Sequence, residues 1–268
     1  MNDILFLNKE IKNINDFIIL DCRAKHEYDA MHIKNARWLN FKDPYLKDGW
    51  DNFINESEFS FLMSEVGIKN KDKILVYDNG NQGNAARYCG ASARFWYIAK
   101  HYGHSQVYIL NGGIKGDMQF EKNNKLPKFD KTDYKTKLTQ GFIYKLDEIL
   151  LNFEKLTFID IRTQEEYYGK KLYGDSRGGH IPGAIHMDIS NFVSKDESIS
   201  FASTHDLKYK LANLHIKEDN ILLIYCQVGI RAAFAAIAIR LAGFKNVLLY
   251  DGGIYEWSRV PYLKLDKN

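Results

Sequence analysis

The segment Asn220-Ile-Leu-Leu-Ile-Tyr-Cys-Gln-Val-Gly-Ile-Arg231 decides how this chain folds. Its apolar run, residues 221–225, shows no alternation of apolar and polar side chains, which predicts a strand buried on both faces of a parallel sheet. The residues from Ile230 to Ala242 are mostly strong helix formers and are followed by Gly243, which predicts a helix that ends there. A buried strand, a short loop and a helix therefore follow one another, and Cys226 is the first residue of the loop.

This position suits a nucleophilic cysteine. Parallel α/β sheets place their sites at the carboxyl ends of strands. The N–H groups at a helix start lack intrahelical partners, and the helix dipole adds partial positive charge there. A thiolate is stabilised at such a place, so we expect Cys226 to be a nucleophile at neutral pH, with Arg231 adding a full positive charge. The alternative is that Cys226 is a small buried apolar residue, as many free cysteines are.

The composition is that of a soluble globular protein. The 268 residues suffice for two domains, and 45% of them are hydrophobic and 26% charged. The net charge of +3 is too small to predict a nucleic acid or an acidic membrane as partner. The cysteines Cys22, Cys89 and Cys226 form no CxxC pair. Neither a disulfide framework nor a metal site is therefore expected, and a reducing cytoplasm is the expected location.

Nothing in the sequence predicts export or membrane insertion. The first ten residues lack a basic region, and their apolar run is too short for a signal peptide. The most apolar helical stretch, from Ala232 to Ile239, lies between two arginines and is far shorter than a membrane span.

One pattern occurs twice, in the same order and at nearly constant spacing. An apolar run ending in Asp-x-Arg recurs after 139 residues, each time followed by a Glu-Tyr pair and a His-Ile pair. Two further apolar runs also recur, the second of them before a Gly-Gly pair. The matched segments are Asp21–Arg23 with Asp160–Arg162, Lys73–Asp78 with Asn220–Cys226, and Val107–Gly113 with Val247–Gly253. This repetition predicts an α/β fold of two homologous domains, each a mainly parallel sheet flanked by helices.

We expect residues 1–120 to form the first domain, 121–139 a linker and 140–268 the second domain. The linker region is dense in Lys, Asp and Asn and shows little periodicity. The first domain has Asp78 where the second has Cys226, and its following loop, residues 79–90, is longer. Aspartate cannot form a nucleophilic thiolate, so only the second domain is expected to be catalytic.

The chain resembles the rhodanese family, specifically the tandem-domain sulfurtransferases of the thiosulfate and 3-mercaptopyruvate type. The resemblance extends from about residue 17 to residue 257. It is carried by Asp160-Ile-Arg162, Gly179-His-Ile-Pro-Gly-Ala184, Tyr225-Cys226 with the loop to Arg231, and Tyr250-Asp-Gly-Gly253 with Trp257. It implies an inactive first domain, a catalytic second domain and an active site near their interface.

The resemblance also implies a mechanism. The Cys226 thiolate would attack the outer sulfur of a small anionic donor, expel sulfite or pyruvate, and hold the sulfur as a persulfide. A thiol, cyanide or a protein cysteine would accept it. The loop amides would bind the thiolate and the persulfide. These amides belong to Gln227, Val228, Gly229, Ile230 and Arg231. No metal or organic cofactor is implied.

Two further arginines match, by position, arginines that the family uses to bind substrate. They are Arg162 and Arg177, and a guanidinium fork suits the paired oxygens of an oxyanion. For Arg162 the alternative is an ion pair that fixes the loop after its strand. For Arg177 the alternative is a solvent-facing cation in a glycine-rich loop. His180 is expected to be a structural residue of its turn.

The loop departs from both donor types of the family. Mercaptopyruvate-type loops resemble Cys-Gly-Ser-Gly-Val-Thr, but here Val228 and Arg231 replace the two hydroxyl residues. Thiosulfate-type loops resemble Cys-Arg-Lys-Gly-Val-Thr, but here Gln227 and Val228 replace the two cations. The absence of hydroxyls and the cation at the end of the loop favour thiosulfate, with 3-mercaptopyruvate as the alternative.

Two other classes of protein are less consistent with the sequence. Phosphatases of the Cys-x5-Arg type need a longer loop, because Arg231 follows Cys226 after only four residues and leaves too little room for a phosphoryl group. A non-catalytic binding or scaffold protein is the other alternative, since a fold never fixes function by itself. The presence of Cys226, Gly229 and Arg231 argues against it.

Overall fold

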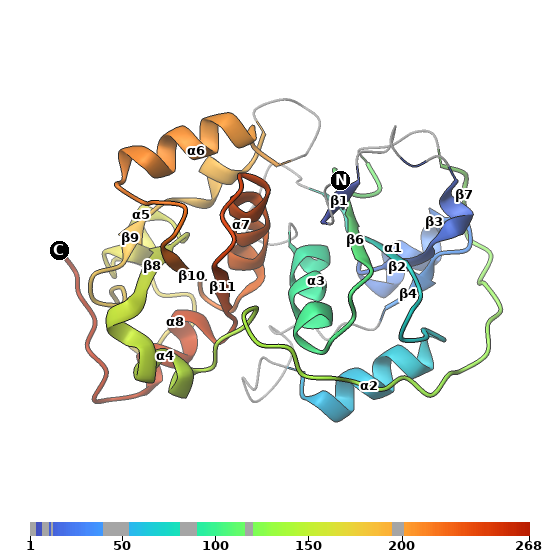
Figure 1. Ribbon diagram of the computed structural model, residues 1–268, viewed down its shortest axis with the longest axis horizontal. Coiled ribbons are helices and arrows are strands. Elements are labelled where there is room, and N and C mark those ends of the chain that lie inside the picture. The colour runs from blue at the N-terminus through green and yellow to red at the C-terminus, as the bar shows by residue number, and fades with distance from the viewer. Residues whose placement is uncertain are drawn as a thin grey trace.

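The computed structural model describes residues 4–6, 11, 13–39, 54–80, 90–115, 120–194 and 201–268. Two lobes lie side by side, and each is built on a sheet of parallel strands with helices packed against it (Figure 1). The predicted α/β fold with two parallel sheets is therefore confirmed.

The first sheet has the strand order β1-β6-β5-β2-β4, with neighbouring strands parallel. Its strands are β1 (Leu5–Phe6), β2 (Ile18–Asp21), β4 (Arg37–Trp38), β5 (Ile74–Tyr77) and β6 (Val107–Leu110). A separate antiparallel pair joins β3 (His32–Ile33) to β7 (Lys122–Asn123). The helices of this lobe are η2 (Ile14–Asp16), α1 (Lys25–Ala30), α2 (Glu56–Glu65) and α3 (Ala91–His101).

The second sheet has the order β11-β10-β8-β9, again with parallel neighbours. Its strands are β8 (Leu156–Asp160), β9 (Ile185–His186), β10 (Ile221–Tyr225) and β11 (Val247–Tyr250). The accompanying helices are α4 (Leu146–Asn152), η4 (Phe153–Lys155), α5 (Gln164–Tyr167), η5 (Ile189–Phe192), α6 (Thr204–Asn213), α7 (Ile230–Leu241) and α8 (Gly253–Arg259).

The matched sequence segments form matched parts of the two sheets. The strand β10 lies between β8 and β11, just as β5 lies between β2 and β6. Four of the five residues of β10 are buried, as the unbroken apolar run predicts for a central strand covered on both faces. The predicted helix after Gly229 is α7, and it ends before Gly243, whose φ of +101° is in the region that favours glycine.

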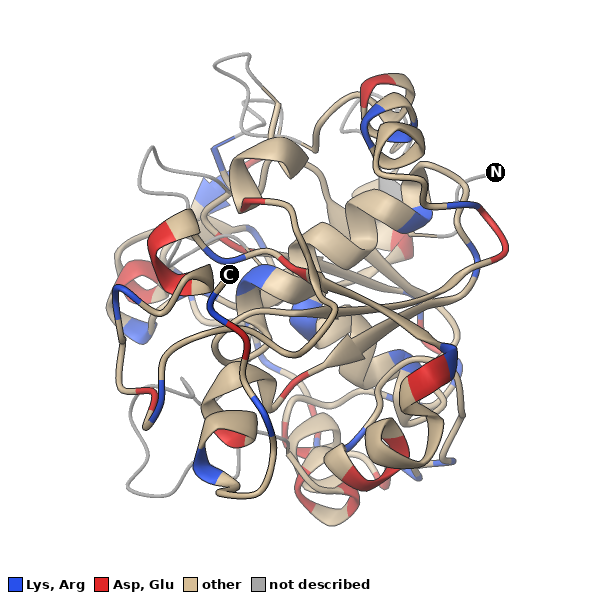
Figure 2. Ribbon diagram, turned by 90° about the vertical axis from the view of Figure 1, so that its left-hand side faces the viewer, with Lys and Arg blue, Asp and Glu red and all other residues tan. Residues whose placement is uncertain are grey.

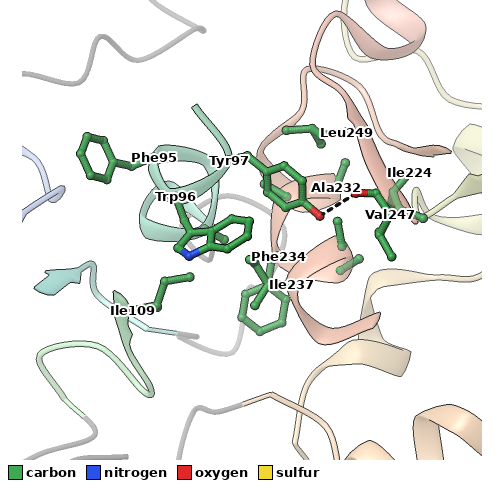
Figure 3. Close-up of a cluster of buried hydrophobic side chains, with 14 of the residues drawn as sticks. Phe95, Trp96, Tyr97, Ile109, Ile224, Ala232, Phe234, Ile237, Val247 and Leu249 are labelled. Carbon is green, nitrogen blue, oxygen red and sulfur yellow. Dashed lines mark hydrogen bonds between the residues drawn. The ribbon is translucent and has the colours of Figure 1, made fainter. Parts of the chain in front are cut away.

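The two lobes share one apolar core along α3 and α7. Figure 3 shows Trp96 on α3 beside Phe234 and Ile237 on α7, within the buried cluster that extends to both sheets. The Tyr97 hydroxyl donates to the Val247 carbonyl at 3.3 Å and accepts from Arg240 Nε at 2.9 Å. Because β10 leads directly into α7, this packing brings the first lobe close to the loop that contains Cys226.

The segment 121–139, our proposed linker, lies along the first lobe. Figure 1 shows it passing α2 on its way to the second lobe. The Thr132 amide donates to the Ser64 carbonyl, and Tyr134 is buried against Phe59. The domain limits given above remain a proposal.

Charged residues of both signs are interspersed over the face shown in Figure 2. Within the part of the chain that the structure describes, no helix is both long and apolar enough to cross a membrane.

Candidate active site

Cys226 lies at the carboxyl edge of the second sheet. It follows Tyr225, which is paired with Asp160 of β8 on one side and with Tyr250 of β11 on the other. Its side chain is 1% exposed and belongs to the buried cluster that continues into α7. The loop from Cys226 to Gly229 is therefore short and held between the central strand and the helix.

Helix α8 fixes the direction of the loop's peptide groups. The Cys226 carbonyl accepts from the Ile254 amide at 2.9 Å, and the Gln227 carbonyl accepts from the Tyr255 amide at 3.2 Å. In a planar trans peptide the N–H points opposite to the carbonyl, so the amides of Gln227 and Val228 point away from α8. No hydrogen bond donated by these two amides occurs among the described residues.

Gly229 completes the turn into α7. Its φ is +81°, in the left-handed region, and a Cβ there would collide with Oδ1 of Asp251. The first backbone bond of α7 runs from the Ala233 amide to the Gly229 carbonyl at 2.8 Å. The amides of Gly229 and Ile230 precede this bond and have no acceptor within the helix. Together with the two amides before them, they form a set of N–H groups suited to an anion.

The charge of Arg231 is balanced, which corrects the expectation of a full added charge. Arg231 lies in the first turn of α7, and its guanidinium binds both carboxylate oxygens of Glu166, at 2.9 and 2.7 Å. Burial alone would raise the pKa of Glu166, but the hydrogen bonds and charge of Arg231 hold it below its ordinary value. Glu166 was not predicted as the partner of Arg231. Its place three residues after Thr163, in a capping box, was the available signal.

Arg162 forms the ion pair that was the alternative expectation for it. Its guanidinium, 1% exposed, binds both carboxylate oxygens of Asp160 and donates to the Gly179 carbonyl at 2.7 Å. Burial would lower the pKa of Arg162, but the charge and hydrogen bonds of Asp160 raise it above its ordinary value. Asp175 adds a longer contact at 3.7 Å. The guanidinium therefore fixes the start of the loop after β8, and substrate binding by Arg162 stays a prediction without support from these contacts.

The guanidinium of Arg177 is bound by backbone carbonyls in and after the last turn of α8. Its guanidinium donates to the carbonyls of Ser258, Leu263 and Val260, each at 2.8 Å. A cation there interacts favourably with the carboxyl end of a helix dipole. Arg177 thus joins the glycine-rich loop to α8 and is not the solvent-facing cation of the alternative expectation, and its substrate role stays a prediction.

The remaining loop side chains face protein. The Gln227 amide group donates to the Tyr173 carbonyl and, at 3.4 Å, to Oδ1 of Asp175, and Val228 is fully buried. Both residues can therefore donate hydrogen bonds to an anion through their backbone N–H groups. Asp175 and Tyr173 were not anticipated, because they come from an irregular loop with no pattern of its own.

The other residues considered in the sequence have structural surroundings. The ring of His180 stacks on Tyr167 with centroids 3.6 Å apart, and its Nδ1 lies 3.0 Å from the Tyr167 carbonyl oxygen. Burial, and then the charges of Asp78 and Asp21, raise the pKa of Cys22 well above its ordinary value, which disfavours a thiolate. Cys89, with most of its loop, lies outside the described residues. Among the described residues, no group of three or more His, Cys, Asp or Glu side chains could hold a metal ion.

In the first lobe, Asp78 occupies the place of Cys226 and fills its own loop. Its Oδ1 accepts from the Gly80 amide at 2.8 Å, and its Oδ2 accepts from the Ser92 amide at 3.1 Å and hydroxyl at 2.8 Å. Ser92 is the second residue of α3, as Arg231 is of α7. The carboxylate therefore takes the N–H groups that an anion would take in the second lobe.

The amino end of α3 meets the candidate site. A Cβ at Gly90 would collide with the Ile230 carbonyl oxygen, so the two helix starts are in close contact. Four residues along α3, Arg94 forms a buried ion pair with Asp251, with N–O distances of 2.7 and 2.6 Å. The candidate site thus lies at the junction of the lobes.

The architecture matches a known domain family. The model of the rhodanese-like domain matches residues 7–119 and 145–260. The chain is 30% identical over 273 residues to a thiosulfate sulfurtransferase of Corynebacterium glutamicum, covering 96% of this chain and 84% of that protein. It is 28% identical over 261 residues to the sulfur carrier protein TtuD of Thermus thermophilus, covering 90% and 87%.

Solved structures agree in fold. An anaerobic ergothioneine biosynthesis enzyme from Chlorobium limicola, in complex with trimethyl histidine, superposes with a TM-score of 0.81 at 22% identity. The match covers 94% of this chain, which spans 64% of that enzyme's length. Two matched domains and relatives named thiosulfate sulfurtransferase support a sulfurtransferase role, and the chain belongs to the rhodanese-like family.

Proposed function

We propose that the protein is a thiosulfate sulfurtransferase that carries sulfur as a persulfide on Cys226. The observation that carries the proposal is the loop geometry: a cysteine at the end of β10, whose following peptides turn their carbonyls to α8 and their N–H groups away from it. The twelve-residue helix α7 begins directly after this loop and adds the positive end of its dipole.

The first half-reaction forms one bond and breaks one. The Cys226 thiolate attacks the outer sulfur of thiosulfate, an Sγ–S bond forms, and the sulfur–sulfur bond of the donor breaks as sulfite leaves with the electron pair. The enzyme is left with a terminal persulfide anion. The loop N–H groups stabilise the negative charge before and after the step, because they are already oriented and need no rearrangement.

The second half-reaction returns the thiolate. Cyanide, a thiolate or a protein cysteine attacks the outer sulfur of the persulfide, and the Sγ–S bond breaks toward Cys226. With cyanide the product is thiocyanate. Because Cys226 must be a free thiol between turnovers, a reducing compartment such as the cytoplasm suits this cycle.

Thiosulfate is favoured as donor over 3-mercaptopyruvate for two reasons. The loop offers N–H groups for an anion and has no hydroxyl residue between Cys226 and Arg231. Relatives of comparable length are named thiosulfate sulfurtransferase.

The test is intact-mass spectrometry after incubation with thiosulfate and, separately, with 3-mercaptopyruvate. We expect one added sulfur atom from thiosulfate, located on Cys226 by peptide mass and removed by cyanide. The Cys226→Ser variant should gain none, whereas the matched Cys22→Ser variant should behave as wild type. Sulfur gained only from 3-mercaptopyruvate would select the alternative donor, and sulfur gained from neither would overturn the proposal.

A further inference from the structure

The ion pair between Arg94 and Asp251 joins the two lobes beside the candidate site. Arg94 is on α3 of the first lobe, and Asp251 follows β11 of the second. Its N–O distances are 2.7 and 2.6 Å, and each side chain is only 3% exposed. A buried carboxylate without its cation is strongly unfavourable, so Asp251 depends on a residue of the lobe that has Asp78 in place of Cys226.

Asp251 lies next to Cys226 at the edge of the sheet. Tyr225 and Tyr250 are partners in the parallel pair of β10 and β11, and Cys226 and Asp251 are the residues that follow them. Neighbouring strands are about 4.8 Å apart, so the two residues start from adjacent positions. Oδ1 of Asp251 also occupies the place that a Cβ of Gly229 would need. The carboxylate thus packs against the loop that is proposed to hold an anion.

The carboxylates around this loop each have a cation among the described residues. These are Glu166 with Arg231, Asp160 and Asp175 with Arg162, and Asp251 with Arg94. The first two cations belong to the second lobe, and only Arg94 comes from the first. Loss of Arg94 would leave a negative charge against a loop that must stabilise a thiolate and then a persulfide.

We propose that Arg94 is a positioning residue for sulfur transfer: it neutralises Asp251 and holds it against Gly229, so that the Cys226 loop can stabilise an anion. This inference rests on the proposed function for its role in turnover. It assigns the first lobe a part in the chemistry, as the source of one charge that the catalytic lobe does not supply.

The test compares Arg94→Gln, Asp251→Asn and the double variant with wild type. Two rates are measured on folded protein: alkylation of Cys226 by iodoacetamide and persulfide formation from thiosulfate. We expect Arg94→Gln to slow both by about tenfold or more, since unit charges a few ångströms apart interact strongly near a protein interior. Asp251→Asn should be at least as fast as wild type, because it leaves a cation rather than an anion beside the loop, and the double variant should recover most of the loss.

A matched control removes another contact between the lobes. Tyr97→Phe loses the hydrogen bonds to Val247 and Arg240 but leaves the charges at the loop unchanged, so both rates should equal those of wild type. A purely structural ion pair would lower thermal stability in both single variants alike and leave the two rates per folded molecule unchanged. That result would overturn the inference.

The outcomes separate this inference from the proposed function. If wild type takes up no sulfur but Arg94→Gln still slows alkylation, the proposed function fails and the positioning role of Arg94 stands. If wild type takes up sulfur and Arg94→Gln equals it in both rates, the inference fails alone. Should Arg94→Gln not fold, Asp251→Asn must be alkylated faster than the double variant, and equal rates would overturn the inference.

Discussion

The two lobes use one strand–loop–helix unit in opposite ways. In the first lobe the Asp78 carboxylate accepts from Gly80 and Ser92, so the loop between β5 and α3 binds an anion of its own chain. In the second lobe Cys226 starts a loop whose peptide N–H groups are turned away from α8. We infer that the shared unit is an anion site, which the first lobe fills permanently and which, under the proposed function, binds a sulfur anion in the second.

The same contrast holds for the glutamate beside each loop. Glu27 in α1 accepts from the neutral Asn79 amide group at 2.7 Å, whereas Glu166 in α5 binds the Arg231 guanidinium. The second lobe therefore has a cation at the start of its helix, and Glu166 neutralises the charge of that cation. We infer that the backbone N–H groups, rather than an uncompensated side-chain charge, dominate anion stabilisation there.

The largest expected effect comes from the residue that distinguishes the loops. Cys226→Ser should lower the rate of sulfur transfer from thiosulfate to cyanide by more than about a thousandfold, because the nucleophile itself is lost. Thiocyanate formation measures the rate. The urea midpoint of unfolding of the variant should stay close to that of wild type, as is usual for a conservative substitution.

A double variant tests whether the cysteine alone accounts for the difference between the two loops. Adding Asp78→Cys to Cys226→Ser should not restore turnover, because the first lobe has a longer loop and Ser92 in place of Arg231. Recovery of activity in this double variant would show that the two loops are equivalent apart from one side chain, and would contradict our comparison.

The sequence predicted the elements of this comparison well but not the partners of its charges. The strand, loop and helix around Cys226 follow from local patterns, and the Asp78 exchange follows from the repeat. The partners of Arg231 and Arg177 do not follow, because Glu166 lies 65 residues away and the carbonyls of α8 are backbone groups present at every residue. A side chain's type can be inferred from a motif, but its partner depends on how distant segments pack.

The next largest effect is expected when Arg231 loses its partner Glu166. Glu166→Gln leaves the buried Arg231 without its counter-charge, which should lower the free energy of unfolding by about 3–5 kcal/mol. Because the loop then carries an uncompensated cation, the KM for thiosulfate should fall. Urea unfolding and initial rates measure the two effects.

The matched change in the first lobe is Glu27→Gln. Its partner Asn79 is neutral, so the loss should be only about 1 kcal/mol, and the KM for thiosulfate should not change. Equal losses of stability in the two variants would show that the charge of Arg231 contributes nothing beyond hydrogen bonding.

A smaller effect is expected when the first loop loses its own anion. Asp78→Ala leaves the amides of Gly80 and Ser92 without their acceptor, which should cost about 1–3 kcal/mol of stability. Sulfate should then recover part of the loss, because the emptied loop presents the same N–H groups to an added anion. Thermal unfolding with sulfate and with chloride tests this, with Asp78→Asn as the matched variant that retains one acceptor. An Asp78→Ala protein that gains no more from sulfate than wild type would refute the idea of a filled anion site.

The smallest expected effect is a pH dependence of stability, which follows from the different residues near the ends of α3 and α7. Near its end α3 has the buried His101, whereas α7 has Arg240 at the corresponding position. Burial, with a contribution from Lys145, lowers the pKa of His101 to about 4, and Glu56 opposes this shift. Burial also lowers the pKa of His104. The unfolded chain then binds protons at higher pH than the folded one. The contribution of His101 to stability is therefore complete above about pH 6.5 and is lost as the pH falls toward 4, and the contribution of His104 is lost in the same direction.

Because His101 is almost fully buried, its part of this loss should be about 1–2 kcal/mol at pH 5. Urea unfolding between pH 7 and pH 5, above the range in which Glu166 titrates, should show stability falling with pH in wild type and falling less in His101→Gln. His104→Gln is the matched variant and should remove a separate part of the slope. Both of these histidines belong to the first lobe, so mild acid should loosen the first lobe before the second. Amide hydrogen exchange that increases first in α7 would contradict that order and would place the acid-sensitive group in the second lobe.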